Sequence, residues 1–373
     1  MSAIRLVSAL LLMLGASAVL FSARPPEPAF DVPAKQPVSV TGPAFAEHVL
    51  PQPTPSAHSV SLVDLGNGKI GAAWFGGRRE GADDVGVWFS VFSNKQWERA
   101  REIVNRANTQ AEVARFVRKI GNPVLWRAPD GPLHLFFVSV SYGGWAGSSI
   151  NHKISLDGGM NWQAARRLVT SPFLNISTLV RGAPLTLSDG SVVLPVYHEF
   201  ISKFPEWLHL APDGAVITKR RMDHGRNTLQ PSVAALDERH ALAVLRYGGP
   251  APARIWAAET RDGGLGWEPA RALPLPNPNA GIALARLSDG RLLLAYNPVE
   301  GNRNRLGLAV SADGGVTWKA SRMLEDSTDA ANEYSYPSVL QSDDGYIHVA
   351  YTYHRKSIKH VVFTPAWLEG EAM

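Results

Sequence analysis

The sequence predicts an all-β protein, a six-bladed β-propeller, and three observations lead to this prediction. The chain of 373 residues contains 33 Gly, 27 Pro and 11 Trp, a composition typical of many short strands joined by turns. One turn motif occurs three times, and one strand motif recurs six times at intervals of about 50 to 63 residues. A hydrophobic fraction of 45% against 19% charged residues supports a large core.

The turn motif reads Ser/Thr-x-Asp-Gly-Gly-x-x-Trp and occurs at Ser155–Trp162, Thr260–Trp267 and Ser311–Trp318. An Asp at this place folds its carboxylate onto nearby backbone N–H groups, and the Gly pair accepts positive φ. The Trp then packs back beneath the turn. We therefore expect three structural β-hairpin turns, with a degenerate copy that ends at Trp97.

The strand motif is a Gly followed by an alternating apolar run, and an apolar strand precedes each copy. Six repeats of about 50 residues suit four-stranded blades around a central axis. Two domains would be expected to show a break in composition near the middle of the chain, and the sequence has none there. Residues 46–373 are therefore predicted to form one propeller. The copies are Gly68–Trp74, Gly131–Phe137, Gly190–Val196, Arg239–Leu245 (without the Gly), Gly290–Tyr296 and Gly345–Tyr351.

Residues 1–23 are predicted to be a signal peptide or an N-terminal anchor. Arg5 precedes an apolar run from Leu6 to Phe21, and Ala16–Ala18 offers small residues for cleavage. The run is close to the length that spans a bilayer, so an uncleaved anchor is the alternative. Residues 24–45 are Pro-rich and predict a linker or an extended segment. The body of the chain is therefore expected to be periplasmic or secreted, with inner-membrane attachment if the segment stays uncleaved.

Composition also limits partners and cofactors. The chain has no Cys, which excludes disulfides, thiolate metal sites and a Cys nucleophile. The basic residues behind the net charge of +4 are scattered, so no nucleic-acid partner is expected. His58, His198, His354 and His360 show no tight ligand spacing, so no metal or other cofactor is expected.

The repeats also predict where the chemistry lies, because the inner strands of a propeller begin at one end of the central channel. Most of these starts are polar or aromatic although they head apolar strands, and positions buried for packing alone would be apolar more often. We therefore expect a concave, charged site at this end. Counting nine residues back from each repeat Gly or its equivalent reaches Asn122, Arg181, Gln230, Gly281 and Tyr336, ten back from Gly68 reaches His58, and the next strands leave the channel near Glu199, Arg246 and Asn297.

At these residues the sequence resembles bacterial sialidase-like proteins with BNR (Asp-box) repeats, of the sialidase superfamily. Arg246 follows Gln230 by sixteen residues, where sialidases place an Arg sixteen residues after a Glu. Arg305 lies six residues before Ser311 and resembles another arginine of the sialidase carboxylate clamp. Tyr336 resembles the sialidase Tyr nucleophile. The resemblance covers nearly the whole mature chain.

The resemblance implies a glycan ligand and exo-hydrolysis of a terminal acidic sugar such as sialic acid. Arg246 and Arg305, with Arg181 as a further candidate, would bind the sugar carboxylate through forked, charge-assisted hydrogen bonds. Tyr336 would attack the anomeric carbon, because a carboxylate nucleophile would be repelled by an anionic sugar.

The acid/base residue implied by the resemblance is Asp84, which would protonate the leaving oxygen and later activate water. Asp83 and Glu80 compete for this role from the same segment.

Two positions depart from the family pattern. His58 stands where sialidases begin with an arginine, and Gln230 stands where the family has the glutamate partner of its tyrosine. The first change weakens the arginine clamp, and the second removes the base that would activate a phenol with a pKa near 10. Glu199 could supply a carboxylate from the adjacent blade. Asn122 and Asn297 are expected among the substrate-binding residues.

Each candidate also has a structural interpretation. Tyr336 could be a packed aromatic residue, and Tyr334 is the candidate if the register slips. Arg246 could form an internal salt bridge, Arg305 could lie in a solvated turn, and Asp84 could cap a loop. His58 could be a structural histidine, and Trp74 and Trp88 could belong to the core and not to a sugar platform.

Three functions remain open at this stage. The first is the exported exo-glycosidase. The second is a polysaccharide lyase acting on uronate-containing chains, with His58 and Tyr336 as base and acid, which would tolerate Gln230. The third is a non-catalytic glycan-binding propeller, favoured by the two departures.

Overall fold

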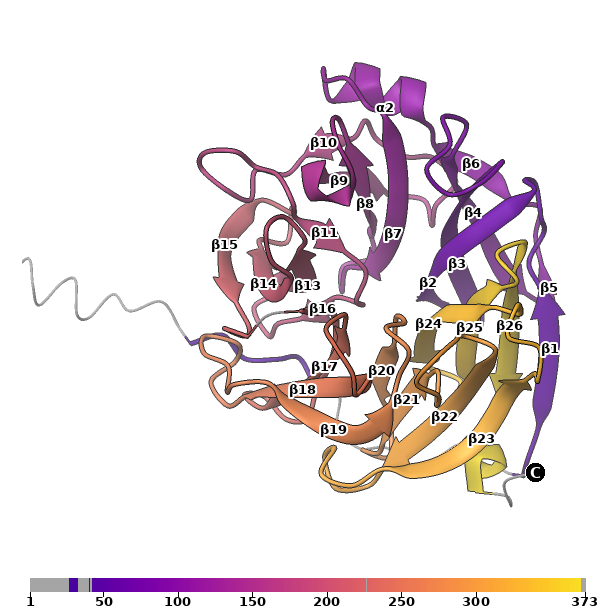
Figure 1. Cartoon of the computed structure of the whole chain (residues 1–373). Coiled ribbons are helices and arrows are strands. Elements are labelled where there is room, and N and C mark those ends of the chain that lie inside the picture. Colours follow the sequence, from indigo (N-terminus) through magenta and orange to yellow (C-terminus); the bar gives the residue numbers. More distant parts are fainter. Residues whose placement is uncertain (1–26, 33–39, 41, 226, 370–373) are drawn as a thin grey trace, which may run out of the picture.

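The computed structural model describes residues 27–32, 40, 42–225 and 227–369. Their strands form six sheets that stand around a central axis (Figure 1), so the predicted six-bladed β-propeller is confirmed. The predicted signal peptide or anchor, residues 1–23, lies outside the described residues. Within the described ranges, no helix combines the length and the apolar character that crossing a bilayer requires.

The six blades follow one another along the chain. Among the residues that the structure describes, two short 3-10 helices and one α-helix lie between or after strands. Blade 1 contains β2 (Ser56–Gly66), β3 (Lys69–Gly77), β4 (Gly86–Ser93), β5 (Gln96–Trp97) and β6 (Arg101–Val104), and α2 (Arg106–Glu112) leads to blade 2. Blade 2 contains β7 (Lys119–Arg127), β8 (Leu133–Val140), η1 (Trp145–Gly147), β9 (Ser148–Ser155) and β10 (Arg166–Arg167). Blade 3 contains β11 (Leu179–Val180), β12 (Leu185–Thr186), β13 (Val192–His198), β14 (Phe204–Leu210) and β15 (Val216–Arg221).

The second half of the ring repeats the same antiparallel order. Blade 4 contains β16 (Thr228–Ala235), β17 (Ala241–Tyr247), β18 (Arg254–Thr260) and β19 (Arg271–Pro276). Blade 5 contains β20 (Ala283–Arg286), β21 (Leu292–Tyr296), β22 (Arg305–Ser311) and β23 (Lys319–Asp326). Blade 6 contains β24 (Tyr334–Gln341), β25 (Ile347–Tyr353), β26 (Ser357–Phe363) and, from the amino end, β1 (Phe45–Val49), and η2 (Pro365–Glu369) follows it.

The ring closes through the pairing of β1 with β26. Phe45 lies opposite Phe363 and Val49 opposite Lys359, so the first strand of the propeller completes its last blade. This pairing joins the two ends of a sheet array that would otherwise open, and it covers the exposed edge of β26. The positions of blades 1 and 6 relative to each other therefore depend on it.

The hydrophobic core is divided into six main clusters, one between each pair of neighbouring blades. Between blades 5 and 6, for example, Leu293 and Leu308 pack with Val349 and Val361, all fully buried. Burying such a side chain contributes about 1.5–3 kcal/mol. Because each blade packs on two neighbours, the inner strands are held at a constant spacing around the axis.

The three Asp-box turns have the predicted structure. In the first, Asp157 accepts a hydrogen bond from the backbone N of Asn161 at 2.8 Å, and Gly158 and Gly159 have φ of 69° and 90°. The Trp162 indole N–H donates to the Gly159 carbonyl at 3.2 Å. A Cβ on Gly159 would lie 2.5 Å from the ring of Phe89 in blade 1, so this glycine also permits close packing between blades.

Residues 27–32 of the predicted linker pack against blades 3 and 4. Phe30 is buried, forms a β-bridge with Leu187 and meets the ring of Trp207 edge-on at 6.2 Å. Asp31 and Val32 contribute to the lining of a cavity of about 560 Å³ at the ends of the inner strands, opposite the strand starts that the sequence singles out. This segment therefore lies across the mouth of the channel that is remote from the predicted site.

Two buried histidine pairs occupy matching places in blades 2 and 6. His134 and His152 have ring nitrogens 2.9 Å apart, and His348 and His360 have ring nitrogens 3.0 Å apart. Burial lowers the pKa of His134 and His348 to about 4 and that of His152 to about 3, and it also lowers that of His360 well below the ordinary value. All four imidazoles are therefore neutral in the folded protein at neutral pH.

We expect the free energy of unfolding to fall as the pH drops below about 6.5, the pKa of histidine in an unfolded chain. Below that value the unfolded chain binds protons that the folded chain excludes, so this stabilisation is complete above pH 6.5 and is lost towards pH 4 and below, by about 1.4 kcal/mol per unit of lowered pKa. Thermal melts across this range measure it. The variant His152→Gln should show a shallower fall even if it starts less stable, and parallel slopes for both chains would contradict the assignment.

Candidate active site

The inner strands of four blades begin with the same β-bulge. In β2, β7, β16 and β24 the register shifts by one residue near the strand start, so that two residues of the inner strand lie opposite one residue of its partner. The first of these two residues has positive φ. A bulge of this kind re-aims a side chain at the end of a strand. These bulged residues are Ser59, Asn122, Gln230 and Tyr336, with φ of 54°, 46°, 48° and 54°.

Proline follows three of the four bulged residues, at positions 123, 231 and 337. The bulge explains this, because a bulged residue has no partner in the ladder and the missing N–H of proline then costs no hydrogen bond. The nine-residue count therefore identified Asn122, Gln230 and Tyr336 correctly as equivalent positions. In blade 1 the ten-residue count is wrong by one, since the equivalent residue is Ser59 and not His58.

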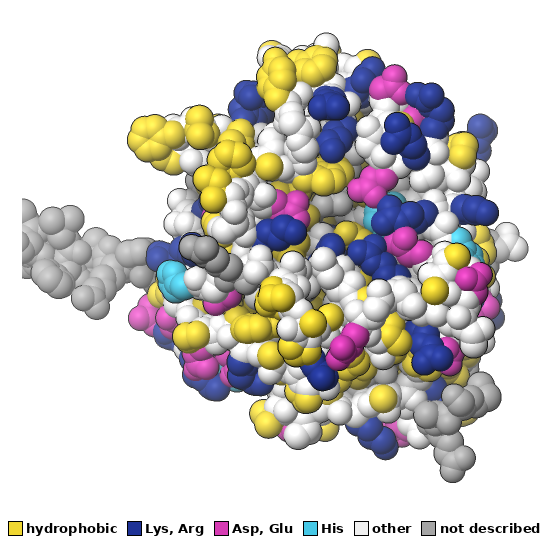
Figure 2. Space-filling view, in the orientation of Figure 1, with side chains coloured by type: hydrophobic (Ala, Val, Ile, Leu, Met, Phe, Trp, Pro, Cys, Tyr) yellow, Lys and Arg dark blue, Asp and Glu magenta, His cyan; other side chains and the backbone are white. Residues whose placement is uncertain are grey.

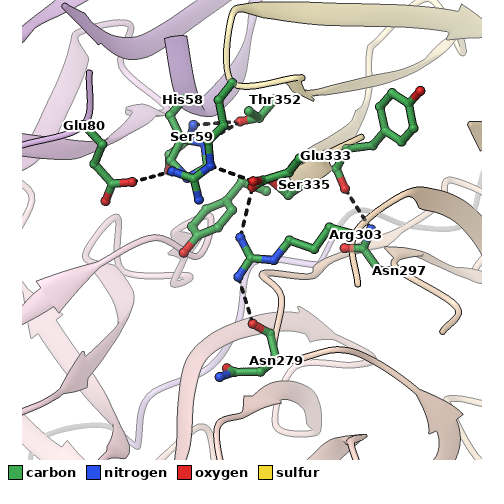
Figure 3. Close-up of polar contacts among 12 residues, drawn as sticks. His58, Ser59, Glu80, Asn279, Asn297, Arg303, Glu333, Ser335 and Thr352 are labelled. Atoms are coloured by element: carbon green, nitrogen blue, oxygen red, sulfur yellow. Dashed lines mark hydrogen bonds and ion pairs between the residues drawn. The ribbon is translucent and has the colours of Figure 1, made fainter. Parts of the chain in front are cut away.

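His58 nevertheless lies beside Tyr336. Their ring centroids are 4.3 Å apart, and His58 Nδ1 lies 3.0 Å from the Thr352 hydroxyl (Figure 3). Burial, and then the positive charge of Arg355, lower the pKa of His58 well below its ordinary value. His58 is therefore a neutral, hydrogen-bonded ring against the face of Tyr336.

Tyr336 is the centre of the polar cluster. Arg246 Nη1 donates to the Tyr336 hydroxyl oxygen at 2.9 Å and to Gln230 Oε1 at 3.0 Å, while Arg246 Nε donates to Asn279 Oδ1 at 2.6 Å. Burial opposes ionisation of Tyr336, but the positive charges of Arg246 and Arg303 outweigh it, so the pKa of Tyr336 is lowered. The phenol is thus prepared to lose its proton.

Gln230 is held between this arginine and a second tyrosine. Its amide nitrogen donates to the Tyr197 hydroxyl at 3.2 Å, and Asn122 Nδ2 donates to the same hydroxyl at 3.2 Å. Burial and the nearby Glu199 carboxylate raise the pKa of Tyr197, so this phenol stays protonated. These contacts fix the orientation of the Gln230 amide. Its nitrogen faces the Tyr197 hydroxyl and its oxygen faces Arg246.

Arg181 adds a buried guanidinium to the cluster. It lies 5.2 Å from the centroid of the Tyr336 ring, and its Nη2 donates to the Pro337 carbonyl at 2.5 Å. Its Nε has no hydrogen-bond partner, and burial lowers the pKa of Arg181 to about 10. A Cβ on Gly281 would lie 3.3 Å from Arg181 Nε and 3.4 Å from both Gln230 and Tyr336. The glycine therefore lets these three side chains approach one another closely, and a larger side chain at position 281 would crowd them.

A chain of ion pairs borders the cluster on the side of blades 5, 6 and 1. Glu333 binds Arg303 at 3.0 Å and Arg355 at 2.6 Å, and Arg355 also binds Glu80 at 2.7 Å (Figure 3). Burial alone would raise the pKa of Glu333, but hydrogen bonds and the two arginines lower it to about 2. Arg303 lies 5.7 Å from the Tyr336 ring centroid.

Several predicted site residues lie elsewhere. Arg305 pairs with Asp326 at 2.7 Å on the surface of blade 5, and Arg303, two residues earlier, takes its expected place. Asn297 is completely buried and donates to the backbone carbonyls of Arg305 and Tyr334, so it has a structural contact rather than an open amide.

The acidic candidates of the 78–84 segment separate in the structure. Asp84 is exposed and accepts hydrogen bonds from the backbone N and the Nε of Arg78. Asp83 binds the same guanidinium at 2.5 Å. Glu80, the third candidate, is the one that contacts the cluster, through Arg355.

Glu199 lies near Tyr197, and its backbone N donates to Ser177 at 2.8 Å. Its carboxylate forms no ion pair or hydrogen bond that involves the described part of the chain. Trp74 is completely buried and belongs to the core, and Tyr334 is buried against Tyr353. The register did not slip, so Tyr336 remains the site tyrosine.

Sequence reasoning missed Arg303, Glu333, Arg355 and Asn279. All four come from loops or strand ends that no repeat spacing reaches. The only signal was the number of charged residues in segments 302–305 and 354–356. No group of three His, Asp or Glu side chains in the described ranges is arranged to hold a metal ion.

Six blades, three Asp-box turns and a tyrosine held by arginine at one end of the channel define a propeller of the sialidase type. A family model described as BNR repeat-like domain matches residues 68–349. The chain belongs to this sialidase-like BNR repeat family.

Solved structures with the same fold include several sialidases. The Hadza microbial sialidase Hz136 matches with a TM-score of 0.68 and 16% identity over 82% of this chain, which spans 65% of that protein. The intramolecular trans-sialidase from Ruminococcus gnavus matches with a TM-score of 0.68 and 13% identity, covering 87% of this chain and 98% of the other. NanB sialidase from Streptococcus pneumoniae matches with a TM-score of 0.66 and 10% identity, covering 89% and 71%. These likenesses show a shared fold. A search of curated proteins found no match.

We expect Tyr336 to ionise below the ordinary tyrosine pKa of about 10, because Arg246 donates to its oxygen. Replacing Arg246→Met should raise the pKa of Tyr336, because the positive charge beside its oxygen is removed. The matched control Arg305→Met removes a guanidinium bound to Asp326 and should leave it unchanged. Ultraviolet difference titration measures the ionisation, with Tyr336→Phe to assign the transition. Identical curves for wild type and Arg246→Met would rule out this coupling.

Proposed function

We propose that this protein is an exported exo-glycosidase of sialidase type that hydrolyses a terminal acidic sugar from glycans. The observation that supports this most directly is the contact between Arg246 and the Tyr336 hydroxyl at the arginine-lined end of the channel. Membership of the sialidase-like family agrees with it. The export part of the proposal rests on the apolar run from Leu6 to Phe21.

The arginines divide into two kinds, and this division favours an anionic ligand. Arg303 and Arg355 are neutralised by Glu333 and Glu80. Arg246 and Arg181 have no carboxylate partner in the described part of the chain. Their positive charges therefore remain available beside Tyr336, where a sugar carboxylate would accept charge-assisted hydrogen bonds. His58 stands where the family has an arginine, and in this proposal Arg181 supplies the positive charge that His58 lacks.

Tyr336 acts as the nucleophile in this reaction. Gln230 cannot accept the phenolic proton as a glutamate would, but it also does not compete for the charge of Arg246. Arg246 stabilises the phenolate directly, so part of the activation comes from a cation instead of a base. The Tyr336 oxygen attacks the anomeric carbon as the glycosidic bond breaks, and the glycosidic oxygen leaves with a proton from the acid/base residue. Water activated by the same residue then attacks the anomeric carbon, breaks its bond to Tyr336 and releases the free sugar.

The proton donor comes from the 78–84 segment. Asp84 is the residue that the family resemblance implies, and it must exchange its contact with Arg78 for the substrate. Glu80 is the rival because it already reaches the cluster through Arg355. The variants Asp84→Asn and Glu80→Gln separate these two candidates. Loss of the true donor should lower activity on substrates whose leaving group needs a proton, and should leave activity on substrates whose leaving group needs no proton nearly unchanged.

A uronate-directed lyase is the second candidate, and the contact between the tilted rings of His58 and Tyr336 favours it. A neutral His58, 4.3 Å from the phenol ring, could accept the proton next to a uronate carboxylate while Tyr336 returns a proton to the leaving oxygen. A lyase product contains a new double bond that absorbs ultraviolet light, and a hydrolase product does not.

The decisive experiment incubates the purified protein with aryl α-sialosides, other nonulosonate glycosides and uronate polymers. We expect release of a free acidic sugar without new ultraviolet absorbance. Tyr336→Phe should lower kcat by about 1000-fold or more because the nucleophile is lost. Tyr334→Phe, on the same strand but outside the cluster, should keep most of the activity. Binding without turnover in both wild type and Tyr336→Phe would favour the glycan-binding function instead.

The space beside Gly281 gives a second test of the substrate position. Gly281→Val would place a branched side chain between Arg181, Gln230 and Tyr336, where a Cβ already lies within 3.4 Å of each. We expect KM to rise about tenfold or more. Gly281 is buried, so Tm is also expected to fall, and KM is measured well below the melting transition of the variant. Unchanged KM, measured with the best substrate of the panel, would place the sugar elsewhere.

A further inference from the structure

A group of exposed apolar side chains stands beside the candidate active site on blades 2 and 3. Phe173 and Ile201 are 92% and 95% exposed, and Leu174 and Tyr142 are each 71% exposed. Figure 2 shows hydrophobic side chains along the upper and upper left border of this face. We call this group the apolar rim, and it consists of Phe116, Tyr142, Phe173, Leu174, Phe200 and Ile201.

The apolar rim lies on the same face as Tyr336 because of the blade topology. Its residues belong to segments that precede inner strands, before β7 and β11, or that join the second strand of a blade to the third, after β8 and β13. Both kinds of connection open at the end of the channel where the inner strands begin. The Asp-box turns, which join third and fourth strands, lie at the opposite end.

The loops that carry the rim are well supported by hydrogen bonds. The buried Asn175 accepts from the backbone N and the hydroxyl of Thr170 at 2.8 and 2.9 Å and donates to the Leu168 carbonyl at 2.9 Å. Arg115 donates to Ser141 at 2.9 Å and so joins the two loops that carry Phe116 and Tyr142. The apolar side chains at the tips of these loops are therefore held outward. They leave more apolar area exposed to water than a surface without a binding role usually does.

The charge of the same loops is one-sided. Segments 113–119, 141–147, 167–178 and 199–203 contain one acidic residue, Glu199. Their basic residues are Arg115, Arg118, Lys119, Arg167 and Lys203. Apolar and aromatic tips surrounded by Lys and Arg match a surface that combines an apolar interior with anionic headgroups.

We propose that the apolar rim docks onto a lipid surface that contains anionic phospholipid. The tips enter the boundary between headgroups and acyl chains, and the basic residues bind the phosphates. This docking presents the channel end with Tyr336 to the same surface, so that the glycans within reach are those anchored there. A second copy of the chain fits poorly, because a two-fold contact through this rim would bring the same basic residues together.

The absence of Cys allows a direct test with single-cysteine variants. A polarity-sensitive dye is attached at Phe173→Cys on the apolar rim and, as a control, at Val316→Cys, which lies in an Asp-box turn on the opposite face and is 69% exposed. The labelled full-length protein is mixed with vesicles of phosphatidylcholine alone or with phosphatidylglycerol added. We expect a blue shift and a several-fold rise in fluorescence at position 173 only, on the anionic vesicles, and less at high salt.

Paired variants test whether the rim carries the binding. The double variant Phe173→Ser, Ile201→Ser should partition to anionic vesicles at least tenfold more weakly in a flotation assay, whereas Leu156→Ser, Val316→Ser should match wild type. All chains share the same amino terminus, so any contribution of Leu6–Phe21 is common to them.

Three outcomes would overturn the proposal: no dye response at position 173, an equal response at both labelled positions, or an equal response on neutral and anionic vesicles. Neither assay uses a glycan or turnover. Failure of docking is therefore distinguishable from failure of the proposed glycosidase activity.

Discussion

The pairing of β1 with β26 holds the rest of the structure in place. The candidate site takes His58 from blade 1, Arg181 from blade 3, Arg246 from blade 4 and Tyr336 from blade 6, and nothing in the local sequence brings these residues together. They meet because each blade packs on two neighbours and the closed ring leaves no blade free to rotate outward. An open array of the same blades would keep every Asp box and every inner strand. It would lose the contact between His58 and Tyr336, which spans the closure.

Within the closed ring, charge balance decides what the site can do. Two arginines of the cluster are bound by carboxylates and two are not, so the free positive charge is concentrated at Arg181 and Arg246. The amide of Gln230 fits this arrangement. A glutamate in its place would form an ion pair with Arg246 and would compete with Tyr336 for the same guanidinium. In the proposed reaction, Gln230 in place of a glutamate would therefore leave the activation of the phenol to a cation and not to a base.

The sequence predicts the regular parts of this molecule and misses the irregular ones, for a physical reason. Repeat spacing places Asn122, Gln230 and Tyr336 on equivalent bulges, because blades 2, 4 and 6 start their inner strands in the same way. The connections that face the site obey no such rule, since they are solvated on one side and vary in length. Arg303 and Arg355 come from these connections. The choice of Arg305 over Arg303 failed because Arg305 begins β22 and pairs with Asp326 at the end of β23. Arg303 lies in the connection before that strand, where it reaches Glu333 beside Tyr336.

The two ends of the propeller differ in what their loops must do. The Asp-box turns share one chemistry because each must let a glycine pass close to the neighbouring blade, as Gly159, Gly264 and Gly315 do against Phe89, Trp207 and Leu242. That end is therefore uniform and closed by packing, and residues 27–32 add to it. The end with Tyr336 has no such requirement, so its loops are free to differ from blade to blade. Blades 5, 6 and 1 contribute ion pairs there. Blades 2 and 3 contribute exposed apolar tips, so the border of the cluster differs from one side of the channel to the other.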